Sequence, residues 1–215
     1  MSVAMFMALV FAPSERVQAE VYRLLFIHVP SAWLAFLAFG VVAIASALYL
    51  IRGSSRWDHL AAASAEVGVM FTTLTLVTGS IWGRSVWGVW WQWDPRLTTT
   101  LVMWFIYAGY LSLRAYIDEP EIRYRSAAVL GVIGVVSIPL VWFSVEWWRG
   151  LHPTPSITRP GGGMPQEMLL ALLVSVGAFT MLYIALLQQR IRIQSVSEGI
   201  TRIHEQLRDQ SEVSP

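Results

Sequence analysis

The sequence predicts an all-α fold, a polytopic membrane helix bundle with five full spans and a partial first span. Of its 215 residues, 55% are hydrophobic and only 13% are charged, whereas a soluble domain has about a quarter charged residues. Apolar runs long enough to cross a hydrocarbon core of about 30 Å recur along the chain, separated by short polar turns. The chain has no cysteine, which excludes disulfides, thiolate metal sites and thioether-attached cofactors. The chain lacks the basic cluster that would indicate a nucleic-acid partner.

The first apolar run is too short to cross a bilayer. Residues 2–12 would rise about 17 Å as a helix before Pro13 ends them, so this run predicts a partial span. Residues 21–28 have the 3-4 spacing of a short amphipathic helix, and Pro30 suits an early helix position. Full spans are then expected at five places: 31–51, 61–82, 97–117, 126–147 and 165–187.

Two residues inside these spans carry specific expectations. Glu66 is buried by depth in the second span, and because a carboxylate facing lipid is costly, it should face other helices. Pro139 should kink the fourth span.

The polar tail keeps an apolar 3-4 spacing at Ile193, Val196, Ile200, Ile203 and Leu207. A helix that docks on a partner remains open, but a solvated extension of the last span is slightly favoured because the weak heptad is short. We therefore expect one membrane domain over residues 1–190 and a polar tail over 191–215, on the cytoplasmic side.

The order of spans puts successive connections on alternate sides of the membrane, since only spanning helices satisfy their backbones in lipid. Residues 13–30, 83–96 and 148–164 share one side and carry six arginines, against nine on the other side. The positive-inside rule places the second group in the cytoplasm. Without the two distal tail arginines the counts are seven and six.

Residues 82–98, the Trp segment, hold five of the eleven tryptophans: Trp82, Trp87, Trp90, Trp91 and Trp93. Tryptophan favours the membrane interface, but five in one connection indicate a platform for a large flat ligand. His28 and His152 fall on the same side as the Trp segment, whereas His59 and His204 fall on the other.

These residue types suit a heme. Two imidazoles from separate segments can occupy both axial positions of the iron, and Trp rings can stack on the porphyrin. Arg84, Arg96 and Arg159 are candidates to pair with the propionates. Asp94 or Glu146 could orient a ligating histidine.

Each residue also has a simpler interpretation. The tryptophans fit an aromatic belt, and the two histidines fit an interface anchor and an exposed loop residue. Asp94 is expected to be the N-cap of the next span, with Pro95 at its first position, which is compatible with a site. Clustered Trp could instead form a cation–π cage for a quaternary ammonium ion, as in a small-solute permease.

Four stretches carry a family resemblance. WGRSVWGVWWQWDPRLTT resembles the Trp-rich WWD signature of heme-handling proteins, and HVPSAW at 28–33, VTGSIWG at 77–83 and FSVEWWRGLHPTPSI at 143–157 support it. Over residues 20–190 the chain resembles the heme exporter protein C (CcmC) family of the cytochrome c maturation system. Glu146 matches that family's acidic position before the paired tryptophans.

The resemblance implies a six-span protein of the bacterial inner membrane with the Trp segment on the periplasmic side. It implies that heme b binds there as a non-covalent, transient cargo, with His28 and His152 as axial ligands. The surrounding heme contacts would be Trp82, Trp87, Trp90, Trp91, Trp93, Asp94, Arg84 and Arg96. The partial span at residues 2–12 departs from the family's complete first span.

The resemblance further implies a binding and delivery protein and not an enzyme. Its expected partners are a periplasmic heme chaperone, an ABC-type ATPase with its membrane subunit, and a small single-span accessory subunit. The chain has no Walker motif, so ATP hydrolysis would occur elsewhere. The rival hypotheses are the Trp-lined permease and a structural subunit of an ABC transporter.

Overall fold

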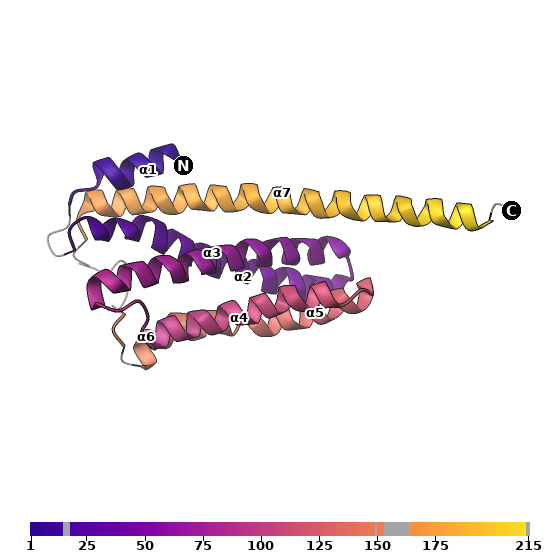
Figure 1. The fold of residues 1–215 in the computed structure, drawn as a ribbon, viewed down its shortest axis with the longest axis horizontal. Coiled ribbons are helices and arrows are strands. Elements are labelled where there is room, and N and C mark those ends of the chain that lie inside the picture. Colours follow the sequence, from indigo (N-terminus) through magenta and orange to yellow (C-terminus); the bar gives the residue numbers. More distant parts are fainter. Residues whose placement is uncertain (15–17, 149, 153–163, 214–215) are drawn as a thin grey trace.

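The described part of the chain is a helix bundle. A computed structural model describes residues 1–14, 18–148, 150–152 and 164–213, and within them it contains helices and no strand (Figure 1). The all-α prediction is confirmed. The elements are α1 Ser2–Phe6, the π-helix η1 Met7–Phe11, the 3₁₀-helix η2 Glu20–Leu24, α2 Leu25–Arg52, α3 Ser55–Trp87, α4 Pro95–Tyr116, α5 Pro120–Gly134, α6 Ser137–Trp147 and α7 Gln166–Val213.

Within the described residues, four helical segments are long and apolar enough to cross a membrane. They are Glu20–Arg52, Ser55–Trp87, Pro120–Trp147 and Gln166–Ser197. The predicted span at 97–117 forms helix α4, which is not among the four. Ser2–Phe11 is a shorter apolar helix, as its length predicted. A multi-pass membrane protein is therefore supported.

Two predicted boundaries are wrong, and both errors concern the region around the Trp segment. Helix α2 begins at Leu25 and contains Pro30, so His28 lies in its first turn and not in a separate helix before the span. The apolar 3-4 spacing continues into the span, which lets one helix form through the proline. Helix α3 continues to Trp87, so Trp82 and Trp87 are helical and the connection itself covers only residues 88–94.

The fourth predicted span is divided at a turn. Helix α5 ends at Gly134 and α6 begins at Ser137. Because Pro139 has no N–H to donate to the Val135 carbonyl, that carbonyl instead accepts from the Ile138 amide at 3.0 Å. The predicted kink of this span is confirmed as a break between α5 and α6, which lies about one turn before Pro139.

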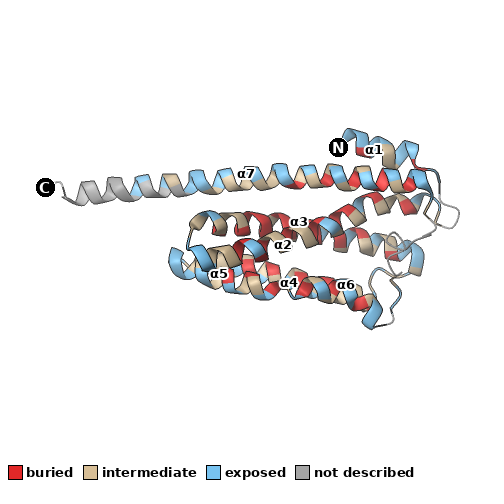
Figure 2. Ribbon diagram, turned by 180° about the vertical axis from the view of Figure 1, so that it is seen from behind, coloured by how far each residue is buried: buried red, intermediate tan, exposed pale blue. Residues whose placement is uncertain are grey.

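Small residues allow α2 and α3 to lie close together at the centre of the bundle (Figure 2). A Cβ on Gly68 would lie 2.7 Å from the Phe39 ring, and Ser64 Oγ donates to the Ala38 carbonyl at 2.8 Å. Phe39 also stacks on Tyr107 of α4, with ring centroids 3.5 Å apart. This contact attaches α4 to the central pair.

Helix α7 packs along α2 and α3 and then extends beyond the bundle (Figures 1 and 2). Glu66 of α3 forms an ion pair with Arg190 of α7, so the expectation that Glu66 faces another helix is confirmed. The tail is one continuous helix with the last span through Val213, in agreement with the interpretation as an extension of that span.

The two ends of the bundle collect different connections (Figure 1). One end, at the left of the figure, holds the beginnings of α2, α4 and α7 and the ends of α3 and α6. The α2–α3 and α4–α5 turns lie at the other end. His28, the Trp segment and His152 therefore share one end, and His59 near the start of α3 lies at the other.

Candidate functional site

The His28 side chain projects from the first turn of α2 against the last part of α3. Its ring meets Trp82 edge to face, with centroids 5.8 Å apart and an interplanar angle of 82°. A Cβ on Gly79 would lie 3.0 Å from Cε1 of this ring. The missing side chain at Gly79 thus allows the imidazole to lie directly on the α3 backbone.

A hydrogen bond to α3 favours one tautomer of His28. Nδ1 lies 3.0 Å from Thr78 Oγ1, and this hydroxyl also lies 2.7 Å from the Leu74 carbonyl, to which it can donate. With the hydroxyl so oriented, Thr78 accepts from His28 Nδ1, and Nε2 carries the lone pair that a metal requires.

The Trp segment leaves α3 through a left-handed glycine. Gly88 has φ +79° and caps the helix, its N–H donating to the Arg84 carbonyl at 3.2 Å. The Arg84 side chain donates back to the Gly88 carbonyl, so this arginine supports the turn. Ser80 Oγ donates to the Trp90 carbonyl at 2.5 Å, which holds the segment over the end of α3.

The five tryptophans are not equivalent. Trp90 and Trp93 are 61% and 76% exposed, whereas Trp82, Trp87 and Trp91 are partly buried. Trp91 and Trp93 meet edge to face with centroids 5.7 Å apart, and Trp87 packs over Gly83 of its own helix. The segment therefore combines anchored rings with rings that are open to a ligand.

Asp94 joins the Trp segment to the segment that carries His152. The carboxylate is 5% exposed. Oδ1 accepts from the Arg96 amide at 2.9 Å, and so Asp94 is the N-cap of α4, with Pro95 at the first position as predicted. Oδ2 accepts from the Leu151 and His152 amides at 2.7 and 3.2 Å. One carboxylate thus begins α4 and holds the backbone at His152.

This arrangement places the two predicted histidines at the same end of the bundle. His152 is half-buried, and its imidazole lies within electrostatic range of the His28 ring, as does the Arg96 guanidinium. Within the described residues, no group of three His, Cys, Asp or Glu could hold a bare metal ion. An iron that arrives with four porphyrin nitrogens needs only two protein ligands.

Three buried polar atoms around the Trp segment have no hydrogen-bond partner among the described residues: Trp91 Nε1, Arg96 Nε and Thr98 Oγ1. An unpaired buried donor is costly, and such groups mark places where a ligand or water completes the network. Arg96 otherwise donates through Nη2 to the Trp142 carbonyl at 3.1 Å.

Some predicted residues are not joined to this cluster. Glu146 is exposed on α6, although it acts electrostatically on Arg96. Arg159 lies outside the described residues. Conversely, Thr78, Gly79 and Gly150 contact these residues but were not expected at the site, and in the sequence only the VTGS stretch pointed to the first two. A Cβ on Gly150 would overlap Asp94 Oδ2.

The fold defines a class, a polytopic helical membrane protein, and places the Trp segment, His28 and His152 at one end of its bundle. The family model described as heme exporter protein C matches residues 1–206. The chain belongs to the heme exporter protein C family. The resemblance inferred from the sequence motifs is thereby confirmed.

Named relatives agree with this assignment. The chain is 42% identical to heme exporter protein C of Bradyrhizobium diazoefficiens, over 81% of this chain and 67% of that protein. It is 38% identical to the Haemophilus influenzae protein of the same name, over 90% of this chain and 79% of that protein. It is 37% identical to heme exporter protein C of Escherichia coli K12, over 85% of this chain and 74% of that protein.

Proposed function

We propose that this protein binds heme b at the periplasmic face of a bacterial inner membrane and hands it to a periplasmic heme chaperone during cytochrome c maturation. The observation that carries the proposal is that His28 packs on Trp82 and lies within electrostatic range of His152, at the end of the bundle that holds the Trp segment. Membership of the heme exporter protein C family supports heme as the cargo.

In this proposal the two histidines take the axial positions of the heme iron, one from α2 and one from the segment after α6. The bond from His28 Nδ1 to Thr78 directs Nε2 to the metal, as outer hydrogen bonds commonly do for histidine ligands. Asp94 holds the His152 backbone. The ligands are thus fixed by two independent contacts.

The remaining predicted contacts surround the porphyrin. Trp90 and Trp93 offer exposed ring faces, while Trp82, Trp87 and Trp91 form the partly buried support. Arg96 is the stronger candidate for a propionate because its Nε is buried without a partner among the described residues. Arg84, whose side chain bonds the Gly88 carbonyl, is the weaker one.

The exposed rings suit a cargo that must leave. Heme on Trp90 and Trp93 would be reachable from solution, so a soluble chaperone could accept it there. The chain would act by binding and transfer, without bond-making catalysis. Its further partners would be an ABC-type ATPase, the membrane subunit of that ATPase and a small single-span accessory subunit.

Topology belongs to the same proposal. Helix α4 would be a further span beside the four long apolar segments, because it packs on α3 and α6 and Tyr107 stacks on Phe39 of α2, although its composition is less apolar. The excess of arginine at the opposite end favours the periplasm for the Trp segment. Residues 1–190 then form the heme-handling membrane domain, and residues 191–215 form a cytoplasmic tail.

Heme spectroscopy tests the ligand assignment. Wild-type protein reconstituted with heme should give a Soret band and a low-spin spectrum. His28→Ala and His152→Ala should each convert it to a high-spin or weakly bound form. His204→Ala, on the exposed part of α7, is the control and should match wild type. Unchanged spectra in both site variants would refute the assignment, and heme-independent uptake of a quaternary ammonium ion would favour the permease.

A further inference from the structure

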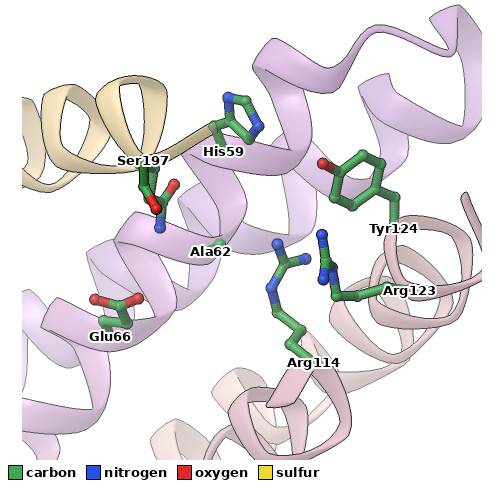
Figure 3. Close-up of a pocket in the computed structure, with 8 residues that line it drawn as sticks. His59, Ala62, Glu66, Arg114, Arg123, Tyr124 and Ser197 are labelled. Carbon is green, nitrogen blue, oxygen red and sulfur yellow. The ribbon is translucent and has the colours of Figure 1, made fainter. Parts of the chain in front are cut away.

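A polar pocket lies at the end of the bundle opposite the Trp segment (Figure 3). It has a volume of about 200 Å³, and its lining comes from α3, α4, α5 and α7. The lining includes His59 near the start of α3 and Arg114 near the end of α4, and Ser197 of α7 also contributes. The pocket therefore lies beside the start of α3 and the end of α4.

Among the described residues, the charged groups around this pocket leave Arg123 without an ion pair. Arg114 forms a bidentate pair with the buried Asp58, at 2.5 and 2.7 Å. Glu66 is neutralised by Arg190. Arg123 forms no ion pair with a described residue; its guanidinium lies 5.2 Å from the Tyr124 ring centroid and Nη1 makes one 3.5 Å contact with the Ile117 carbonyl. Most of its donors are thus available.

The neighbouring groups suit an oxyanion. Figure 3 shows Arg114 and Arg123 side by side, with Tyr124 and His59 beyond them. Ser197 and Gln194 of α7 also line the pocket. Guanidinium and hydroxyl donors match a phosphate and not an apolar ligand.

We propose that this pocket binds the phosphate of an anionic molecule, with Arg123 as its principal ligand and Ser197 on α7 as a second contact. Basic pockets between helices at the ends of spans bind anionic lipid headgroups, and the position of this pocket beside the start of α3 and the end of α4 favours a phospholipid as the source. The bound phosphate would join α5 to α7, which both contribute residues to the pocket. This site is separate from the heme site and its function.

Binding of short-chain phosphatidylglycerol to the full-length protein in a phosphate-free detergent tests the proposal. Arg123→Gln should weaken the apparent Kd about tenfold, or about 1.4 kcal/mol. Arg123→Lys, which keeps the charge, should lose less. Arg56→Gln is the matched control, since Arg56 is exposed on α3 at the same end and does not line the pocket. Unfolding midpoints without lipid should be equal for all variants.

Two further ligands identify the source. Diacylglycerol with the same chains lacks the phosphate and should not bind at this site. Inorganic phosphate that displaces phosphatidylglycerol, and binds through Arg123 by itself, would assign the pocket to soluble phosphate. The proposal is overturned if Arg123→Gln binds phosphatidylglycerol as wild type does, or if diacylglycerol binds equally well.

Discussion

Single hydrogen bonds position the two candidate heme ligands, and neither bond comes from a neighbour in the sequence. His28 is held by Thr78, 50 residues away, and the backbone at His152 is held by Asp94, 58 residues away. Each partner has a second duty, in a helix hydrogen bond for Thr78 and in the N-cap of α4 for Asp94. Substitutions at these contacts therefore test how the histidines are positioned, separately from whether they bind the iron.

Thr78→Val removes the acceptor for His28 Nδ1 while it keeps the shape of the side chain. We expect heme affinity to fall about tenfold or more, the range found when the outer partner of a histidine ligand is lost. Heme titration followed at the Soret band measures this. Thr78→Ser retains the hydroxyl and should bind as wild type does; equal affinity of the valine variant would show that Thr78 does not orient the ring.

Gly150→Ala should displace the segment that carries His152, because the added Cβ overlaps the buried Asp94 carboxylate. The heme spectrum is expected to resemble that of His152→Ala, with membrane insertion unchanged. Gly177→Ala is a suitable control, since nothing lies within 4 Å of a Cβ there. A normal low-spin spectrum in Gly150→Ala would mean that the contact with Asp94 is not needed.

At the scale of secondary-structure elements, the places where helices end or break determine where the candidate site residues lie. Helix α3 ends at the left-handed Gly88, α4 begins at the Asp94–Pro95 cap, and α5 gives way to α6 before Pro139. The seven residues between α3 and α4 thus hold Trp90, Trp91 and Trp93 at the end of the bundle. The break before Pro139 sets the direction of α6, which leads to His152.

Pro139→Ala restores a donor for the Val135 carbonyl and should let α5 and α6 join into one helix. Amides 135–139 are then expected to exchange with deuterium more slowly, because each gains an i→i−4 bond. The straightened helix should also move the Trp142 carbonyl away from Arg96, with weaker heme binding as the result. Unaltered exchange would place the cause of the break elsewhere, for example at Gly134, which packs against Tyr107.

The whole molecule separates two polar sites by the length of an apolar bundle. The Trp and His cluster lies at one end, and the Arg123 pocket lies at the other. Near that pocket, Asp58 is 2% exposed and forms an ion pair with Arg114 on α4. This buried pair connects α3 to α4.

Asp58→Asn leaves the Arg114 charge without a counterion and should destabilise the protein by about 3–5 kcal/mol. Thermal unfolding in detergent measures the change, with exposed Glu119→Gln as the control. Asp58→Leu combined with Arg114→Met should recover most of the loss, since apolar replacement of both partners is often neutral. The heme spectrum of the folded fraction should not change, because the pair lies at the other end.

The sequence by itself determined the all-α membrane class, the kink near Pro139, the Asp94 N-cap and the heme exporter protein C family. Each of these follows from local composition or from a contiguous motif, because hydropathy and cap chemistry act between residues that are near in the chain. Alternation of spans also put His28, the Trp segment and His152 on one side, without any knowledge of distances.

Only the tertiary structure decided which residues support the site. The role of Thr78 depends on the packing of α2 against α3, which brings His28 to its hydroxyl. The role of Gly150 depends on the contact of its segment with Asp94. The continuity of α2 through Pro30 and of α3 to Trp87 likewise depends on packing between helices. Long-range contacts of this kind leave no periodic signal in the sequence, since the two contacting residues lie in separate segments of the chain.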